Sequence, residues 1–331
     1  MTVTLPLTRD AVIREAAASG FRVPAVEKVA RLMNLLDTIN RDPYLRDRFA
    51  LKGGTALNLF IFNLPRLSVD IDLNYIGSRE RSVMLEERKT AELIIVRICE
   101  QAGLTIRKQA TEHLGGKWIL PYRSTSGTAD QIEIDLNYGL RDPLWGTVRM
   151  SSATLGSWSS SDVLVLDEHE LAAGKLVALL ARAATRDLFD AHQLLTTRTL
   201  DTERLRLGTV LYGAMNLVDW RTVGPTTVVF TPQDFTNNLL PVLLSSHAEQ
   251  ARTDPTWAER MVERVRGELG RLFPLREPEI EFIRRVRDEG NIAGDLLTSD
   301  SGMIDRINQH PMLRWRVQQR MNNAAHGAQR D

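Results

Sequence analysis

The stretch that decides the fold runs from Leu51 to Tyr75 and reads LKGGTALNLFIFNLPRLSVDIDLNY. Near its end, from position 69 to 74, apolar and polar residues alternate, as they do on a β-strand with one buried face. Asp70 and Asp72 therefore point to the same face, about 7 Å apart along the strand. Two carboxylates this close repel each other in a cleft of low dielectric unless a cation neutralises them. The pattern predicts a strand that holds a divalent metal ion, although a solvated edge strand would show the same alternation.

A glycine-rich turn precedes this strand. Gly53, Gly54 and Thr55 follow the short strand predicted for residues 49–52 and begin a segment of helical composition. Glycines let the backbone approach a ligand closely, and the amides at the start of a helix bind phosphate. The hydroxyl of Thr55 adds a further donor, so the turn is predicted to hold the phosphates of a nucleotide. Ser68, just before the aspartates, is either a loop residue or another ligand of that nucleotide.

A second strand of the same design is predicted at residues 129–138. Glu133 and Asp135 share its polar face because they are two positions apart. If this strand lies beside the first, Asp135 completes a cluster of three carboxylates. Such a cluster can hold two metal ions that bracket the oxygens of a phosphoryl displacement. Glu133 is the alternative third acid. Oxygen ligands of this kind favour Mg²⁺, with Mn²⁺ as a substitute.

Length, charge and cysteine content narrow the class of protein. At 331 residues, the chain is long enough for two domains. Its 42 Lys and Arg balance 42 Asp and Glu, which argues against a protein that coats nucleic acid with its whole surface. Cys99 is the only cysteine, so disulfide scaffolds and cysteine-based metal sites are excluded. The apolar runs are too short to cross a bilayer and no signal peptide opens the chain, so we expect a cytoplasmic protein without membrane contact.

The first part of the chain is predicted to be a mixed sheet with flanking helices. Apolar residues at helical spacing predict helices at residues 24–40 and 79–101. Alternating residues predict two further strands at 104–111 and 117–123, and the glycine pair at 115–116 predicts the turn between them. A sheet with flanking helices that is followed by a helical region makes an α+β fold.

The second part is predicted to be mostly helical. The serine-rich stretch at residues 151–161 indicates a domain boundary near residue 155, which gives domains of residues 1–155 and 156–331. Apolar residues at helical spacing predict the first helices of the second domain, at residues 168–184 and 187–195. A short extended piece is expected at 228–235, and the polar end of the chain is expected to fray from about residue 322.

In their order along the chain, the glycine turn, the Asp-x-Asp strand and the later strand acid resemble the signature of the nucleotidyltransferase superfamily. More narrowly, LKGGTAL at residues 51–57 and RLSVDIDL at residues 66–73 resemble the AbiEii/AbiGii family, which comprises nucleotidyltransferase toxins of abortive-infection and toxin–antitoxin systems. The interval between Gly54 and Asp70 is somewhat longer than is usual in the superfamily. The first domain is therefore expected to be nucleotidyltransferase-like.

A second stretch, ELAAGKLVALLARAATRDLFDAHQLL at residues 170–195, resembles a later motif of the same family. That motif has a lysine on a helix, an arginine and then Arg-Asp-x-x-Asp, and the matching positions here are Lys175, Arg182, Arg186, Asp187 and Asp190. The resemblance implies that the lysine and the first arginine contact the phosphates and that the last aspartate is an active-site acid. The residues by themselves also allow a solvated charged stripe along one helix face.

The resemblance implies a nucleotidyltransferase toxin that depends on Mg²⁺ or Mn²⁺ and uses an NTP to modify RNA, at the 3′ acceptor end of a tRNA, so that translation stops. The implied protein partner is a cognate winged-helix antitoxin of the AbiEi type. The implied catalytic residues are Asp70, Asp72, Asp135, Lys175 and Asp190, of which the first three would bind the metal. The implied nucleotide-binding residues are Gly53, Gly54, Thr55, Ser68 and Arg182. Two alternatives remain: the same fold could modify a protein or a small molecule, by nucleotide transfer or as a kinase, or it could bind a nucleotide without catalysis.

Overall fold

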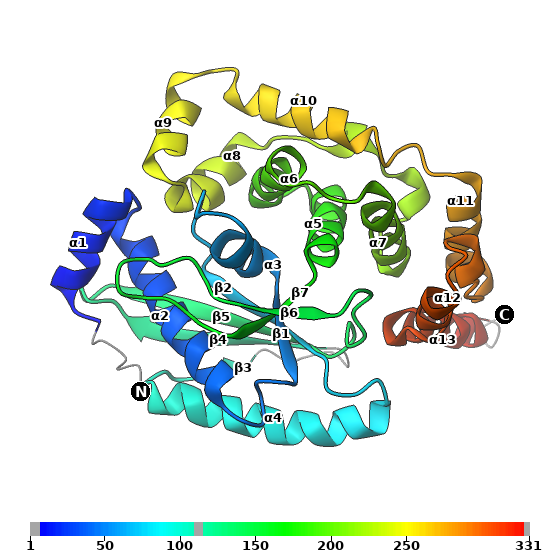
Figure 1. Ribbon diagram of the computed structural model, residues 1–331, viewed down its shortest axis with the longest axis horizontal. Helices are drawn as coiled ribbons and strands as arrows, with labels where there is room; N and C mark the ends of the chain where they lie inside the picture. Colours follow the sequence, from blue (N-terminus) through cyan, green and yellow to red (C-terminus); the bar gives the residue numbers. More distant parts are fainter. Residues whose placement is uncertain (1–6, 109–114, 328–331) are drawn as a thin grey trace. The chain divides into compact units, whose positions relative to one another are not determined.

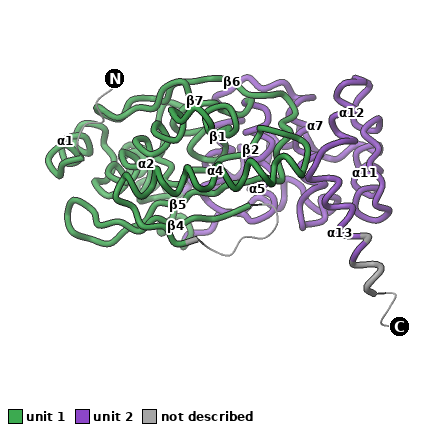
Figure 2. The backbone as a smooth tube through the Cα atoms, turned by 90° about the horizontal axis from the view of Figure 1, so that it is seen from below, with its two compact units in different colours: residues 1–167, 233–255 green, residues 168–232, 256–331 purple. Residues whose placement is uncertain are grey.

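The computed structural model describes residues 7–108 and 115–327, and its chain forms two compact units (Figure 2). Unit 1 is built from residues 1–167 and 233–255, and unit 2 from residues 168–232 and 256–331. The chain therefore enters unit 2 at residue 168, comes back to unit 1 at residue 233 and enters unit 2 again at residue 256. A single boundary near residue 155 was predicted from the sequence, and this second crossing was not. No helix in the described part of the chain has both the length and the apolar character needed to cross a bilayer.

Unit 1 is organised around a β-sheet. The strands are β1 (Phe49–Lys52), β2 (Asp70–Tyr75), β3 (Arg107–Lys108), β4 (Gly115–Arg123), β5 (Ala129–Asn137), β6 (Thr147–Met150) and β7 (Val163–Leu166). Within the described residues they form one seven-stranded sheet in the order β3-β4-β5-β2-β1-β7-β6 (Figure 1). The β2–β5 and β1–β7 pairs are parallel and the other neighbouring pairs are antiparallel. The sheet is therefore mixed, which confirms the predicted α+β fold.

Helices cover the apolar face of this sheet. The helical segments of unit 1 are α1 (Arg9–Ser19), α2 (Val23–Arg41), α3 (Gly53–Thr55), η1 (Ala56–Ile61), α4 (Arg81–Gln101), η4 (Phe235–Leu239), η5 (Leu240–Val242) and α9 (Ser245–Thr253). Helix α2 packs against α4 and against β2, β5 and β7. Arg88 of α4 stacks over the ring of Tyr138, 4.6 Å from its centroid, so α4 covers the same face. The α3–η1 segment lies on the other side of the sheet (Figure 1).

Strand β2 has the alternation that the sequence predicts. Ile71 is fully buried and Leu73 is 2% exposed, on the face that α2 and α4 cover, while Asp70 and Asp72 are partly exposed on the other face. Because β2 lies between β1 and β5, the alternative of a solvated edge strand is excluded. Segment 233–255 is fastened next to this strand, since the amide of Leu67 donates to the carbonyl of Val242 at 2.8 Å.

The sheet also corrects part of the prediction. Gly115 and Gly116 are not a turn but the first two residues of β4, where Gly115 pairs with Asn137. A Cβ at Gly115 would lie 2.7 Å from the carbonyl oxygen of Leu136, so a close strand approach and not a turn requires this glycine. Of the strand predicted at 104–111, β3 covers only two residues, and positions 109–111 lie outside the described residues. The four-residue strands β6 and β7 were not predicted: β6 (TVRM) has no buried residue, and β7 (VLVL) is a short apolar run without alternation.

Unit 2 is helical, as predicted. Its helices are α5 (Glu168–Arg182), α6 (Thr185–Thr197), α7 (Thr202–Met215), η2 (Trp220–Thr222), η3 (Pro225–Thr227), α10 (Trp257–Leu269), α11 (Glu277–Arg284), η6 (Arg285–Glu289), η7 (Gly294–Leu296), α12 (Ser301–Gln309) and α13 (Pro311–Gly327). Helix α5 packs against α6 and α7, and α6 packs against α10. The extended piece expected at 228–235 is correct only at its start: Val228 has an extended backbone and residues 228–231 are not helical, but no strand forms and α8 (Pro232–Asp234) and η4 cover the rest. Helix α13 also continues beyond residue 322, where a frayed tail was expected.

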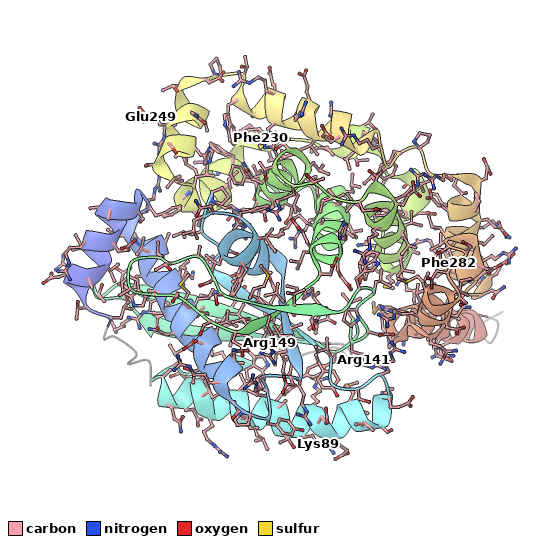
Figure 3. The ribbon with its side chains drawn as sticks, in the orientation of Figure 1. Lys89, Arg141, Arg149, Phe230, Glu249 and Phe282 are labelled. Atoms are coloured by element: carbon pink, nitrogen blue, oxygen red, sulfur yellow. The ribbon has the colours of Figure 1, made fainter. Side chains whose placement is uncertain are left out.

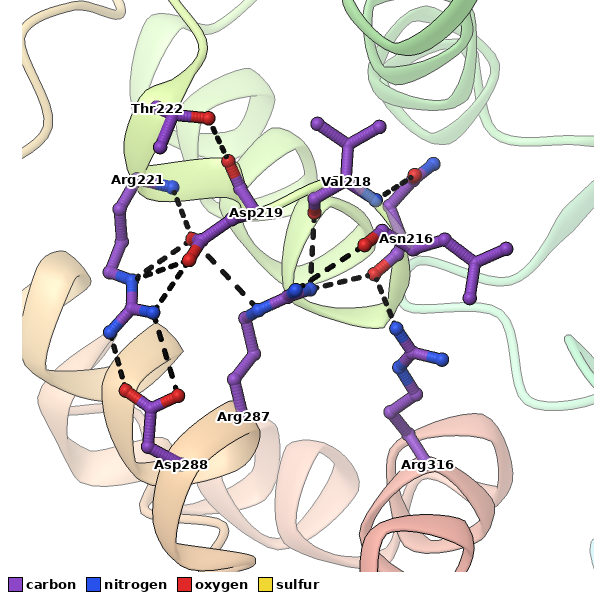
Figure 4. A network of polar contacts seen from close by, with 9 residues as sticks. Asn216, Val218, Asp219, Arg221, Thr222, Arg287, Asp288 and Arg316 are labelled. Carbon is purple, nitrogen blue, oxygen red and sulfur yellow. Dashed lines mark hydrogen bonds and ion pairs between the residues drawn. The ribbon is translucent and has the colours of Figure 1, made fainter. Parts of the chain in front are cut away.

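Charged side chains form hydrogen bonds with the backbone at the C-terminal end of α7 (Figure 4). The carbonyl oxygen of Asn216 accepts hydrogen bonds from Arg287 and from Arg316, each at 3.0 Å. Asp219 in the next turn pairs with Arg221 at 2.6 Å and joins the same network through Nε of Arg287, 3.9 Å from its Oδ1. The last carbonyls of a helix have no partners within it and carry partial negative charge, so these guanidinium groups satisfy them. The network ties the end of α7 to η6 and α13 within unit 2.

Candidate active site

The strand acids meet on the polar face of the sheet in unit 1. Strands β2 and β5 are parallel neighbours, and their register places Asp72 opposite Asp135 and Asp70 opposite Glu133. Residues directly opposite each other on neighbouring strands lie about 5 Å apart and point to the same face. All four carboxylates are partly exposed. Strands β2 and β5 are therefore neighbours, the condition on which a cluster of Asp70, Asp72 and Asp135 depends, and their register places the three residues on one face of the sheet.

The partners of Glu133 bear on which residue is the third acid. Its Oε2 is ion-paired with Nζ of Lys117, and its Oε1 accepts a hydrogen bond from Gln131 at 3.0 Å. Both oxygens thus have protein partners, which favours Asp135 as the third acid. The hydrogen bond to Glu133, with the charges of Glu133, Asp70 and Asp135, raises the pKa of Lys117 above its ordinary value despite some desolvation. Lys117 therefore lies within the electrostatic field of the strand acids.

The glycine turn is pressed against these acids. Gly53 has a φ of 70°, in the left-handed region that favours glycine. A Cβ there would overlap Oδ2 of Asp72 and lie 2.9 Å from its Cγ. A Cβ at Gly54 would lie 2.8 Å from Oγ of Ser68 and 3.0 Å from Nη2 of Arg66. Both glycines are needed because the turn lies directly on the side chains of β2 and of the loop before it.

The two polar residues beside this turn hold it in place. Thr55 is fully buried, and its hydroxyl donates a hydrogen bond to the backbone carbonyl of Asp70. The hydroxyl therefore fastens the turn to β2 in this structure, and phosphate binding by Thr55 stays a prediction. Arg66 is 2% exposed and donates from Nη1 to the carbonyl of Leu67 at 2.9 Å. A buried guanidinium thus lies next to Gly54, at the point where an anionic ligand is expected.

The donor atoms on this face fit Mg²⁺. Among the residues that the structure describes, no three His, Cys, Asp or Glu side chains come together as a ready-made metal site. Mg²⁺ is usually held by one or two carboxylates, with water and substrate phosphates supplying the remaining oxygens. Asp72 and Asp135, side by side in register, supply carboxylate oxygens of this kind. Metal binding by Asp70, Asp72 and Asp135 remains a prediction that this geometry supports.

Three residues of the second motif, Lys175, Asp187 and Asp190, form a buried ionic cluster in unit 2, and the exposed Arg182 pairs with it. Nζ of Lys175, on α5, lies 2.7 Å from Oδ1 of Asp187 and 2.9 Å from Oδ2 of Asp190, both on α6. Nε of Arg182 lies 2.6 Å from Oδ2 of Asp187. Lys175 is 8% exposed and Asp190 is fully buried, so the interpretation as a solvated charged stripe is wrong for Lys175, whereas the Arg182 side chain is 65% exposed. The motif instead joins two helices through compensating charges.

Burial and charge act in opposite directions on Asp187. Burial favours the neutral acid, but Lys175 and Arg182 outweigh it and hold the pKa of Asp187 below its ordinary value. The carboxylate is therefore ionised and paired. Lys175 and Asp190 are also paired with each other. The roles implied by the resemblance therefore remain predictions: phosphate contact by Lys175 and Arg182, and an active-site acid at Asp190.

The sequence interpretation missed Lys117. It lies on β4 directly opposite Asp135, and its ion pair with Glu133 places it at the border of the acid cluster. The available signal was its rarity, since the chain has six lysines among 42 basic residues. Its place beside the acids depends on the antiparallel pairing of β4 with β5, which residue spacing does not determine.

Comparison with known proteins identifies the family of the chain. The family model described as "Nucleotidyl transferase AbiEii toxin, Type IV TA system" matches residues 34–274, which include the glycine turn, both acid strands and the ionic cluster. MenT4, a nucleotidyltransferase toxin from Mycobacterium tuberculosis H37Rv, has a similar fold, with a TM-score of 0.59 and 21% identity over 88% of this chain and 98% of that chain. No curated protein matches. Because the family model spans well over half of the chain, the protein belongs to the AbiEii family of nucleotidyltransferase toxins from type IV toxin–antitoxin systems.

Proposed function

We propose that this nucleotidyltransferase toxin transfers a nucleotide from an NTP to the 3′ end of a tRNA in the cytoplasm, with Mg²⁺ as its metal, and so blocks translation. Family membership already shows that the protein is a nucleotidyltransferase toxin, which implies an NTP substrate and a cognate antitoxin. Nucleotidyltransferases also usually require a divalent metal ion. The metal's identity, the RNA acceptor and a winged-helix antitoxin of the AbiEi type are the proposed refinements. Mn²⁺ is expected to substitute for Mg²⁺, because both prefer oxygen ligands.

One observation carries the proposal: Asp72 lies in register with Asp135 and directly against the Gly53 turn. A nucleotide whose phosphates rest on this turn would have its α-phosphate above the two carboxylates. The left-handed backbone of Gly53, which has no Cβ, lets the turn and the Asp72 carboxylate lie against each other, so that phosphates on the turn would be close to that carboxylate. A bound divalent metal would offset the negative charge shared by the triphosphate and the acids.

The residues of this face suit an in-line displacement. The 3′-hydroxyl oxygen of the acceptor forms a bond to the α-phosphorus, while the bond between that phosphorus and the bridging oxygen breaks and pyrophosphate leaves. The hydroxyl proton passes to the carboxylate of Asp135, which acts as the general base. The turn at Gly53 and Gly54 retains the departing phosphates. Catalysis of this kind depends mainly on positioning and on charge stabilisation, and the packed turn and neighbouring strands provide the positioning.

The test is incorporation of label from each of the four α-³²P NTPs into total RNA, with Mg²⁺, Mn²⁺ or a chelator. The wild type should label RNA of tRNA size at its 3′ end, and the chelator should abolish labelling. Asp72→Asn should reduce the rate by about 100-fold or more, as expected for loss of a group that contacts the reacting centre. Asp47→Asn is the matched control, because Asp47 is an exposed surface acid with 67% of its side chain accessible.

The possible outcomes separate the alternatives. No incorporation into RNA with any NTP would overturn the proposal. Label in protein or in a small molecule would assign the same chemistry to another acceptor. Nucleotide binding without turnover, together with toxicity that survives Asp72→Asn, would indicate a binding module that acts through a partner.

A further inference from the structure

A row of four charged residues crosses the sheet at the level of Asp72. Strand pairing places Lys52 on β1 opposite Asp72 on β2, Asp72 opposite Asp135 on β5, and Asp135 opposite Lys117 on β4. Residues paired in this way share one face of the sheet. With neighbouring strands about 4.8 Å apart, the two lysines flank the acids across roughly 14 Å. The row therefore has a cation at each end and two carboxylates at its centre.

The two ends of the row are not equivalent. The glycine turn follows directly after Lys52, so the phosphates that leave as pyrophosphate lie at the β1 end. In phosphoryl transfer the attacking and the leaving oxygens lie roughly in line on opposite sides of the phosphorus. The attacking hydroxyl must therefore approach from the β5–β4 side. Lys117 is the cation at that end of the row, next to the proposed general base Asp135.

The surroundings of Lys117 suit contact with a phosphodiester. Its side chain is 45% exposed, and Glu133 holds its ammonium by an ion pair. Gln131 in turn donates to the other oxygen of Glu133 at 3.0 Å, which orients that carboxylate. An ammonium has three N–H donors, and one carboxylate oxygen takes one of them. Within residues 7–108 and 115–327, donors thus remain for a phosphate, and Glu133 sets the orientation of the ammonium before a ligand arrives.

We propose that Lys117 binds the backbone phosphate next to the attacking 3′ end of the acceptor RNA, with Glu133 as the residue that positions its ammonium. This inference rests on the proposed transfer to RNA and assigns the acceptor side of the same site to β4 and β5. Lysine suits the task because a compact ammonium can follow a mobile, single-stranded phosphate without the fixed geometry of a guanidinium. Lys52, at the other end of the row, belongs to the nucleotide side.

The first experiment separates the two substrates kinetically. For Lys117→Ala, the KM for RNA at saturating NTP should rise about tenfold, as expected for loss of one contact between charged groups. The KM for NTP at saturating RNA should stay within about twofold of wild type. Lys117→Arg should recover most of the RNA affinity. The matched control is Lys89→Ala: Lys89 also pairs with a glutamate, at 2.9 Å, but it projects from α4 on the covered side of the sheet (Figure 3).

The second experiment does not depend on catalysis. Affinity for a fluorescent tRNA is measured between about 50 and 200 mM salt for wild type, Lys117→Ala and Lys89→Ala. Loss of one phosphate contact should lower the slope of log Kd against log salt by about 0.7, the value for single-stranded nucleic acid. Lys89→Ala should keep the wild-type slope.

The results distinguish failure of this inference from failure of the proposed function. If wild type transfers nucleotide to RNA but Lys117→Ala raises the KM for NTP as much as that for RNA, the assignment of Lys117 to the acceptor is wrong. An unchanged KM for RNA with an unchanged salt slope would also overturn it. If wild type transfers nothing to RNA and does not bind it, the proposed function itself has failed, whatever the variant does.

Discussion

Gly53→Ala tests the idea that the glycine turn exists to let Asp72 lie against the backbone. The substitution has two separable costs. At a φ of 70°, alanine adopts a left-handed conformation that costs about 1–2 kcal/mol of stability. In addition, the new methyl group overlaps Oδ2 of Asp72 and lies 2.9 Å from its Cγ, so the carboxylate must move.

The consequence for activity follows from that movement. To restore ordinary van der Waals contact, the Asp72 carboxylate shifts by on the order of 1 Å, and a misplacement of this size costs about 100-fold in rate. A loss of about 100-fold corresponds to about 2.7 kcal/mol of transition-state stabilisation. Stability should fall only by the backbone cost. Gly53→Ala should therefore remain folded while its nucleotide transfer becomes about two orders of magnitude slower.

Gly103→Ala is the matched control, because Gly103 has a φ of 72° but nothing lies within 4 Å of the position that a Cβ would take there. It should lose a similar amount of stability and keep the wild-type rate. The assays are the initial rate of nucleotide transfer and the midpoint of thermal unfolding for both variants. If Gly53→Ala transfers nucleotide within about threefold of Gly103→Ala, the contact between the turn and Asp72 does not govern catalysis, and the argument is refuted.

Three further predictions concern charge and burial. Lys175→Met should destabilise the fold by about 3–5 kcal/mol in chemical unfolding, because it leaves the buried carboxylates of Asp187 and Asp190 without their ammonium. Asp219, whose pKa is lowered from 3.8 to about 2 mainly by hydrogen bonds from Arg221, stabilises the fold only while it is ionised. The difference in unfolding midpoint between wild type and Asp219→Asn should thus be complete above about pH 4 and vanish as the pH falls through about 2. Burial raises the pKa of the fully buried Cys99 to about 12, so a thiol reagent at about pH 8 should react with it only after unfolding.

Each of these has a contrary result. Lys89→Met, which removes a lysine that is 70% exposed, should leave the unfolding free energy unchanged, and an equally small effect of Lys175→Met would refute the buried-cluster argument. A midpoint difference for Asp219→Asn that grows below about pH 3 would have the wrong sign for a lowered pKa. Rapid labelling of Cys99 in the native protein would show that α4 opens far more readily than its packing implies.

Part of the candidate site could be predicted from the local sequence alone. The alternation from position 69 to 74 was enough to place Asp70 and Asp72 on one face, because side chains on a strand alternate regardless of what surrounds it. Local sequence also placed β1 at Phe49–Lys52, and helical spacing placed α4 close to its observed bounds. The motifs were also enough to identify the family that the family model confirms.

Other features required the tertiary structure. The partner strand of each residue is a contact between segments far apart in the chain, so spacing did not place Asp135 opposite Asp72 or Lys117 opposite Asp135. The glycines at 115 and 116 look like a turn locally, and only the approach of β5 shows why the first is glycine.

The second motif shows most clearly which features the sequence determines and which features only the tertiary structure determines. Its residues and their helical spacing were evident from the sequence, and so was the resemblance that they carry. That Lys175 is buried between two aspartates, and not spread along a solvated helix face, followed only from the packing of α5 against α6. Periodicity is a property of neighbouring residues and can be read from the chain, whereas burial and ion pairing are decided by which distant segments come to lie against it.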